Sequence, residues 1–209
     1  MNRTLGVLIS GRGSNLQALI DAIHEGRLDA RITVVISNNE GAGGLARARR
    51  AGLETLVLSH RDWPSRDDYD RALVRELGSR DVGLVCLAGF MRVVGLPLIE
   101  AFPHAIVNIH PSLLPAFPGL HAQAQAVAHG AKVSGVTVHI VTHELDAGPI
   151  ILQRTVPVLD DDTEQSLAAR ILEEEHRAYP EAVSIMLAGG WTIEGRRFLS
   201  PRRWSGASG

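Results

Sequence analysis

Two polar side chains near the middle of the chain are of the types that acyl or formyl transfer requires. Asn108 and His110 lie in a short β-branched run, which prolines interrupt from Pro111 onward. Residues two apart in a strand share a face, so we expect the amide and the imidazole to point into the same space. An imidazole can transfer a proton near neutral pH, and an amide can donate a hydrogen bond to a developing oxyanion. The pair is a candidate catalytic centre, although a strand ending in a turn, with its histidine bound to backbone, has the same pattern.

A carboxylate, Asp146, lies in the loop that follows the alternating, strand-like segment 135–141. An aspartate beside a histidine favours the protonated imidazole and fixes its orientation, so Asp146 is the expected partner of His110. His139 and His143 would share a strand face but lie about 13 Å apart along it. With no thiolate or paired carboxylate at ligand spacing, the sequence predicts no metal site.

A glycine-rich loop near the N-terminus is the second candidate site. The apolar, strand-like segment 5–10 precedes the loop 11–15, and apolar residues recur at helical spacing over 16–23. This order directs backbone N–H groups and a helix N-terminus at an anion, and Ser14 is expected to cap the helix. The dinucleotide pattern fails because Leu16 replaces its third glycine and the acid expected after the second strand is absent. A phosphate monoester fits better than NAD, and a tight turn without a ligand is the alternative.

The elements that must position these groups alternate along the chain. The expected strands are 5–10, 32–36, 53–58, 82–88, 105–108, 135–141 and 149–158. Helices are expected between most of them, with a long helix over 163–187 and a small hairpin over 191–199. The charged side chains of the helix 67–79 are expected to face solvent. This order predicts a doubly wound, mostly parallel α/β sheet with an antiparallel edge extension, because the last long connection is too short for a crossover.

Composition excludes several classes of protein. The 45% of hydrophobic residues is ordinary for a soluble globular protein, and the net charge of −2 gives no overall attraction to nucleic acid or membrane surfaces. Cys86 is the one cysteine, which excludes an internal disulfide and fits a reducing compartment. No stretch approaches the ~20 apolar residues of a membrane-spanning helix, and no signal peptide is evident. We expect a cytoplasmic protein.

Two segments together resemble the folate-dependent formyltransferases: Asn108 through Pro115, and His139 through Ile150. The opening from Gly11 to Gln17 and the length are similar to the branch that formylates glycinamide ribonucleotide in purine synthesis. The resemblance covers about residues 5–190, with no departure at the catalytic positions. It implies a Rossmann-like formyltransferase fold in one domain, 1–209, made of a phosphate-binding half (1–100), a catalytic and folate-binding half (101–190), and a hairpin and tail (191–209).

The resemblance also implies roles for individual residues. Catalysis would fall to Asn108, His110 and Asp146. Glycinamide ribonucleotide would be bound by Gly13, Ser14, Asn15, Leu172, Glu173, Glu174 and Glu175, although the glutamates alone would indicate a solvated helix face. Formyl-folate would be bound by Arg66, Met91, Arg92, Val93, Val94, Asn108, Thr142, His143, Glu144, Leu145 and Asp146. Residues 91–94 follow a predicted strand, where α/β sheets place ligands, although a hydrophobic turn would have the same pattern.

The implied reaction needs two small molecules and no metal. The glycinamide amine would attack the formyl carbon of 10-formyltetrahydrofolate, which is a cosubstrate consumed at each turnover. Asn108 and His110 would stabilise the oxyanion of the tetrahedral intermediate, and Asp146 would keep the imidazole protonated. We expect no nucleic-acid or membrane partner, and a monomer or homodimer.

Three other interpretations compete with this one. Family members that act on methionyl-tRNA normally carry a further RNA-binding domain, for which this sequence has neither room nor a basic patch. Family hydrolases usually have a second histidine directly after the catalytic one, where Pro111 stands here. A non-catalytic nucleotide-phosphate binding module would tolerate replacement of His110 or Asp146.

Overall fold

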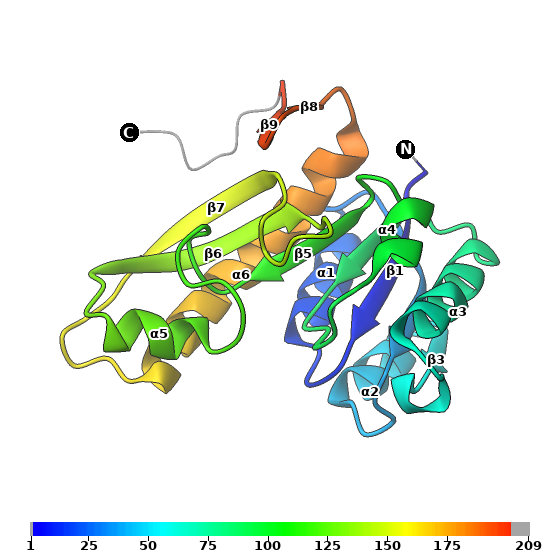
Figure 1. Cartoon of the computed structure of the whole chain (residues 1–209), viewed down its shortest axis with the longest axis horizontal. Helices are drawn as coiled ribbons and strands as arrows, with labels where there is room; N and C mark the ends of the chain where they lie inside the picture. The colour runs from blue at the N-terminus through cyan, green and yellow to red at the C-terminus, as the bar shows by residue number, and fades with distance from the viewer. Residues whose placement is uncertain (1, 202–209) are drawn as a thin grey trace. The chain divides into compact units, whose positions relative to one another are not determined.

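The computed structural model describes residues 2–201, and the chain divides into two compact units, residues 1–108 and 109–209 (Figure 1). Each unit is described on its own below. Arg202, Arg203 and Trp204, whose role the sequence left open, lie outside the described residues. Among the described helices, none is both long enough and apolar enough to cross a membrane.

The first unit is built on a parallel sheet. Its strand order is β3-β2-β1-β4-β5. The strands are β1 (Thr4–Ile9), β2 (Arg31–Ser37), β3 (Thr55–Val57), β4 (Leu84–Leu87) and β5 (Ile106–His110), whose last two residues belong to the second unit. Every residue of β1 and β4 is buried, which explains why both strands read as continuous apolar runs in the sequence.

Helices cover both faces of this parallel sheet. They are α1 (Ser14–His24), α2 (Gly43–Arg50), α3 (Arg66–Gly78) and α4 (Leu96–Ala101), with a 3₁₀ turn η1 (His60–Asp62) before α3. From β1 the chain runs outward to β2 and β3 and then returns to β4 on the other side of β1. Since crossovers are right-handed, this reversal places α1 and α2 on one face and α3 and α4 on the other. Consistently, α1 packs on α2 and α3 on α4. The predicted doubly wound, mostly parallel fold is confirmed.

The second unit contains the antiparallel extension. Its elements are α5 (Ala122–Ala128), β6 (Val133–Ile140), β7 (Ile150–Pro157), α6 (Glu164–Ala188), β8 (Thr192–Glu194) and β9 (Arg197–Leu199). β6 pairs antiparallel with β7 along most of their length, and β8 and β9 form the predicted hairpin. Figure 1 shows α6 running along β6 and β7, on which it packs. A reciprocal pair of hydrogen bonds between Thr163 and Ser166 caps the start of α6.

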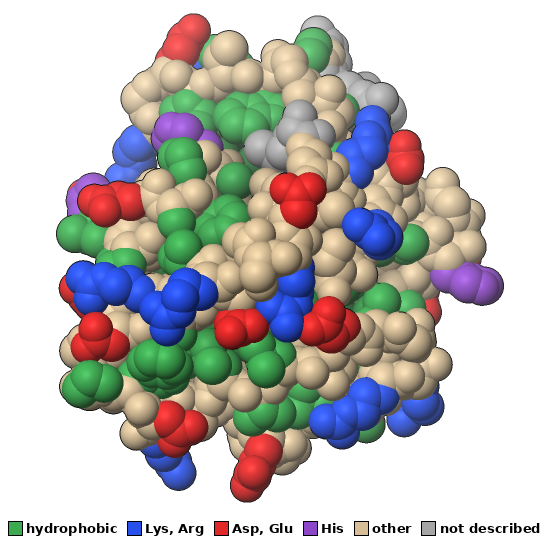
Figure 2. All heavy atoms as spheres, turned by 90° about the vertical axis from the view of Figure 1, so that its right-hand side faces the viewer, with side chains coloured by type: hydrophobic (Ala, Val, Ile, Leu, Met, Phe, Trp, Pro, Cys, Tyr) green, Lys and Arg blue, Asp and Glu red, His purple; other side chains and the backbone are tan. Residues whose placement is uncertain are grey.

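Charged side chains of both signs share the surface. On the face drawn in Figure 2, acidic and basic side chains lie beside one another and are interspersed with hydrophobic ones. For example, Arg71 pairs with Asp68 on α3, and Arg80, two residues after α3, pairs with Glu76 near the end of that helix. Such exposed pairs contribute little to stability, but they cancel the local field.

Two local predictions are wrong. Ser14 does not cap α1: the helix begins at Ser14, and its N-cap is Gly13, whose left-handed backbone (φ 71°) brings no side-chain cap. The reason is a close approach of the glycine loop to the first turn of α2, since a Cβ on Gly13 would lie 2.5 Å from Gly44 Cα. Nor do all acids of α3 face solvent. Asp70 is 1% exposed and accepts a hydrogen bond from Gly95 N, a tertiary contact that helical periodicity alone does not reveal.

The Gly13 contact predicts a steric cost beyond that of the left-handed backbone. Gly26 has the same φ of +71° but no atom within 4 Å of an added Cβ. Gly26→Ala should therefore lower the free energy of unfolding by about 1–2 kcal/mol, the cost of the backbone conformation. Gly13→Ala should lower it by more, about 3 kcal/mol, because the added carbon also clashes. Urea denaturation measures both variants, and equal losses would contradict the close contact.

Candidate active site

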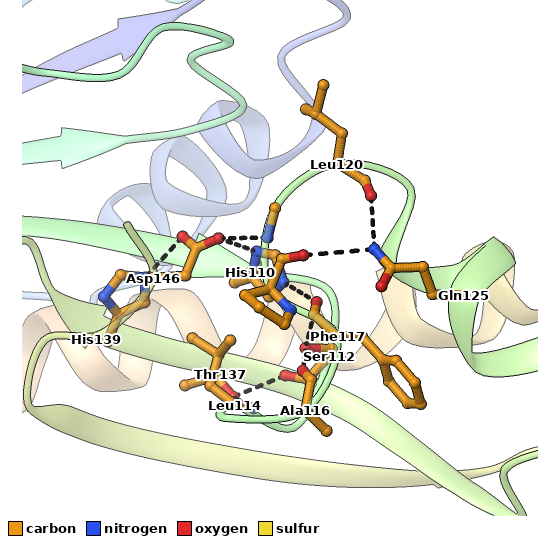
Figure 3. Close-up of polar contacts among 12 residues, drawn as sticks. His110, Ser112, Leu114, Ala116, Phe117, Leu120, Gln125, Thr137, His139 and Asp146 are labelled. Atoms are coloured by element: carbon orange, nitrogen blue, oxygen red, sulfur yellow. Dashed lines mark hydrogen bonds and ion pairs between the residues drawn. The ribbon is translucent and has the colours of Figure 1, made fainter. Parts of the chain in front are cut away.

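His110, the last residue of β5, is held at both ring nitrogens. It is 5% exposed, and its Nε2 lies 2.9 Å from the carbonyl oxygen of Phe117 (Figure 3). A carbonyl only accepts hydrogen bonds, so Nε2 carries a hydrogen. Nδ1 lies 3.5 Å from Asp146 Oδ2, which is also an acceptor. Both ring nitrogens of His110 therefore face an oxygen that can accept a hydrogen bond.

Asp146 lies at the centre of the site. Its Oδ2 accepts a hydrogen bond from Gly119 N at 2.8 Å, and its backbone is in the left-handed region with φ 49°, which aspartate tolerates better than most residues. Burial raises the pKa of Asp146, but the hydrogen bond with His139, the Gly119 N–H and the charge of His110 outweigh burial and lower it below the usual 3.8. The carboxylate is therefore ionised throughout the neutral range.

His139 is the site residue that the sequence interpretation missed. It lies on β6, is 2% exposed, and its Nε2 is 3.7 Å from Asp146 Oδ1. Its Nδ1 is 3.0 Å from the carbonyl oxygen of Ile140, so this imidazole also has an acceptor at each nitrogen. The sequence did contain a signal, because His139 lies near the end of a strand whose exit loop carries Asp146. Among residues 2–201, no group of three or more His, Cys, Asp or Glu side chains is arranged to hold a metal ion.

A buried threonine supports the loop that presents the Phe117 carbonyl. Thr137 Oγ1 donates to the carbonyl of Ser112 at 2.7 Å and accepts from Leu114 N at 3.0 Å (Figure 3). Gln153 Nε2 also donates to this hydroxyl and to the Leu114 carbonyl, both at 2.9 Å. Ser112 Oγ in turn donates to the Ala116 and Phe117 carbonyls. Side chains of β6 and β7 thus fix the loop that orients His110.

The other predicted residues of the second unit lie on two elements. Thr142 through Leu145 directly precede Asp146, and the His143, Glu144 and Leu145 side chains are exposed. On α6, Glu175 is buried, whereas Glu173 is exposed. Glu174 lies 2.9 Å from Arg177 and 3.6 Å from Arg154, so it belongs to an ion-pair network rather than to a freely solvated face.

The predicted residues of the first unit gather at the carboxyl edge of the parallel sheet. Gly13, Ser14 and Asn15 follow β1, residues 91–94 follow β4, and Asn108 lies on β5 beside Leu87. This is the side of an α/β sheet on which ligands bind, next to the point where the strand order reverses. Arg66, the first residue of α3, lies close to Gly95, where the loop 91–94 ends. Arg47 Nε donates to the Arg12 carbonyl, which places the Arg47 guanidinium beside the glycine loop.

Known proteins are similar to this chain over most of its length. Residues 3–183 match the formyl transferase family. The chain belongs to that family. It is 44% identical over 190 residues to phosphoribosylglycinamide formyltransferase of Escherichia coli (strain K12), which covers 91% of this chain and 87% of that protein. It is similar in structure to glycinamide ribonucleotide transformylase 1 from Symbiobacterium toebii, with a TM-score of 0.94, 55% identity, and coverage of 95% of this chain and 94% of that one.

A longer relative matches as well. The trifunctional purine biosynthetic protein adenosine-3 of Drosophila melanogaster is 50% identical over 189 residues, which are 90% of this chain. This formyl transferase spans only 14% of the length of that relative.

The pKa values of Asp146 and Asp70 in this formyl transferase should be shifted in opposite directions from the ordinary value. The pKa of Asp146 is lowered, so its stabilisation of the fold is complete above the pKa of the unfolded chain and is lost as pH falls through the folded value. The pKa of Asp70 is raised, chiefly by burial, so ionising Asp70 lowers stability as pH rises through its folded value. NMR titration of the carboxyl carbons should place the Asp146 midpoint below 3.8 and the Asp70 midpoint above it. The reverse order would contradict this description of the site.

The support beneath the loop predicts an effect on turnover. Thr137→Val leaves the Leu114 N–H without its acceptor and removes one of the two Gln153 amide bonds, which should cost about 1–3 kcal/mol of unfolding free energy. Because the Phe117 carbonyl would no longer be fixed, kcat should fall while the KM values stay near those of the wild type. The control is Thr33→Val, which removes a single hydroxyl bond to the Leu5 carbonyl. Equal kcat in the two variants would contradict a supporting role for Thr137.

Proposed function

We propose that the protein transfers the formyl group of 10-formyltetrahydrofolate to the amine of 5′-phosphoribosylglycinamide, a step of purine biosynthesis. The observation that carries this proposal is the buried imidazole of His110, fixed between the Asp146 carboxylate and the Phe117 carbonyl. Membership of the formyl transferase family supports the reaction type, and the match to glycinamide ribonucleotide enzymes over nearly the whole chain supports the acceptor.

The proposed reaction forms one C–N bond and breaks another. The glycinamide amine attacks the formyl carbon, and the oxyanion of the tetrahedral intermediate accepts hydrogen bonds from Asn108 and His110. An oxyanion is a stronger acceptor than a neutral carbonyl, so it competes successfully with Phe117 for the His110 hydrogen. Collapse of the intermediate expels N10 of the folate, which takes up the proton that the amine loses. The ionised Asp146 keeps His110 protonated during these steps.

We assign the binding of the ribonucleotide phosphate to the loop Gly13–Asn15. Gly13 and the start of α1 direct backbone N–H groups outward without a side-chain cap, which favours an anion at the helix N-terminus. The cation of Arg47 beside Arg12 adds to this preference. Glu173, Glu174, Glu175 and Leu172 are assigned to the remainder of the ribonucleotide.

We assign folate binding to Arg66, the loop from Met91 through Val94, Asn108, and the segment from Thr142 through Asp146. We expect the enzyme to act on these small molecules as a cytoplasmic monomer or homodimer, without a metal ion.

Release of tetrahydrofolate tests the proposal directly. Wild-type protein should release tetrahydrofolate from 10-formyltetrahydrofolate only when glycinamide ribonucleotide is present. His110→Ala should lower this rate by about 10²–10⁴-fold, the usual contribution of a positioned proton-transfer group. The matched control is His24→Ala, an exposed histidine at the end of α1, which should leave the rate unchanged.

Two results would contradict the proposal. Release without any acceptor would indicate a hydrolase, in which water takes the place of the glycinamide amine. No release with either mixture, in protein shown by circular dichroism to be folded, would indicate a binding module instead.

A further inference from the structure

The loop between β4 and α4 is held at both ends by side-chain hydrogen bonds, from Ser10 and from the buried Asp70, that the proposed chemistry does not use. It runs from Gly89 to Gly95 in the first unit and starts where the order of the parallel strands reverses, between β1 and β4. The proposed folate residues Met91–Val94 lie between the two ties.

Ser10 makes the first tie. Its backbone N–H donates to the Gly89 carbonyl at 3.0 Å, and its Oγ accepts from Met91 N at 2.8 Å. The single hydroxyl hydrogen of Ser10 is directed to Asn38 Oδ1 at 2.6 Å, so a lone pair is left facing Met91. Three strand ends are thereby joined: Ser10 follows β1, Asn38 follows β2, and Met91 follows β4. The hydroxyl is part of a fixed network rather than a free rotor.

Asp70 makes the second tie. It lies on α3, is 1% exposed, and its Oδ2 accepts from Gly95 N at 2.5 Å. Burial raises the pKa of Asp70, and the Gly95 N–H and the charges of Arg66 and Arg92 offset part of that increase. Burying a carboxylate costs free energy, which the raised pKa of Asp70 reflects, so a contribution to stability alone does not explain the residue. The position of Asp70 is better explained by its hydrogen bond to Gly95 N, which fixes the end of the loop close to Arg66.

Gly95 leaves no room beside this second tie. A Cβ on Gly95 would lie 2.7 Å from Asp70 Oδ2 and 3.2 Å from Arg66 Nε. The backbone of Gly95 has φ −101°, so an alanine there would be strained by these contacts and not by its own conformation. Gly95→Ala is therefore a selective way to disturb the tie.

The stretch between the ties presents apolar side chains to solvent. Met91 is 66% exposed and Val93 is 53% exposed, whereas Phe90 and Val94 are buried. The Arg92 side chain turns inward, since its Nε is buried and has no hydrogen-bond partner among the described residues. A short loop with fixed ends and outward Met and Val side chains is a preformed apolar surface of the kind that small-molecule sites use.

We propose that Ser10 and Asp70 are positioning residues that fix the two ends of the loop Met91–Val94 and thereby set the affinity for the folate cosubstrate. This inference rests on the proposed function, in which that loop binds formyl-folate. A loop that is already ordered does not lose conformational freedom when the ligand binds, so each tie contributes to affinity without touching the ligand.

Steady-state kinetics with both substrates test the inference. Ser10→Ala and Gly95→Ala should each raise the KM for 10-formyltetrahydrofolate about 3- to 10-fold, the effect of losing one hydrogen bond. The KM for glycinamide ribonucleotide and kcat should stay within about 2-fold, because the Ser10 hydroxyl bonds Asn38 and Met91 and the Asp70 carboxylate bonds Gly95, and none of these belongs to the phosphate-binding residues Gly13–Asn15 or to the reacting groups. Hydrogen exchange of the Met91 and Gly95 amides should become faster in the corresponding variant.

Matched controls separate this role from a general loss of stability. Ser37→Ala removes a different serine hydroxyl at a strand end, a buried one that bonds only Asn39 among the contacts described. Gly78→Ala adds a Cβ with nothing within 4 Å. Both should leave the folate KM unchanged. Asp70→Asn, which keeps an acceptor for Gly95 N, should remain closer to wild type in folate KM than Asp70→Ala.

Two outcomes distinguish failure of the inference from failure of the proposed function. If wild type is active and amide exchange rises in the variants while folate KM does not, the ties do not set affinity and the inference is overturned. If wild type releases no tetrahydrofolate, the proposed function fails instead. In that case, equilibrium binding of 10-formyltetrahydrofolate compares wild type with the Ser10→Ala and Gly95→Ala variants. Equal dissociation constants, or no binding at all, would overturn the inference.

Discussion

The site depends on one carboxylate that is shared between two imidazoles. Asp146 directs one oxygen towards His110 and the other towards His139, while each histidine has a backbone carbonyl at its far nitrogen. Each ring therefore faces a hydrogen-bond acceptor at both nitrogens, and the lowered pKa of Asp146 keeps the shared carboxylate ionised. The Gly119 N–H supplies a further bond to the carboxylate. If Asp146 were neutral, both rings would lose the partner that orients them.

Much of the remaining structure of the second unit serves to keep this arrangement in place. Thr137 and Gln153, on adjacent antiparallel strands, hold the loop that carries the Phe117 carbonyl. The first unit follows a different principle, because it gathers backbone groups at the carboxyl edge of a parallel sheet. The strand order reverses between β1 and β4, which is the position where open α/β sheets bind ligands. Ser10 joins the loops that follow those two strands.

The sequence predicts what depends on local pattern. Continuous apolar runs located β1 and β4, a short connection predicted the antiparallel pairing of β6 with β7, and the spacing of Asn108 and His110 placed both on one strand. Features that depend on long-range contacts were missed. His139 was considered only as a metal ligand, and its contact with Asp146 follows from a loop that turns back on its own strand. Asp70 was assigned to a solvated face, because the periodicity of a helix does not reveal a hydrogen-bond partner, here Gly95, that lies 25 residues away.

A double-mutant cycle on the rate of formyl transfer tests the central claim most directly. Residues that act as one unit are strongly non-additive, because removing either disables the other. The account predicts that His110→Ala combined with Asp146→Ala is hardly slower than the slower single variant. A double variant whose loss equals the product of the two single losses would contradict it, since the two residues would then act independently.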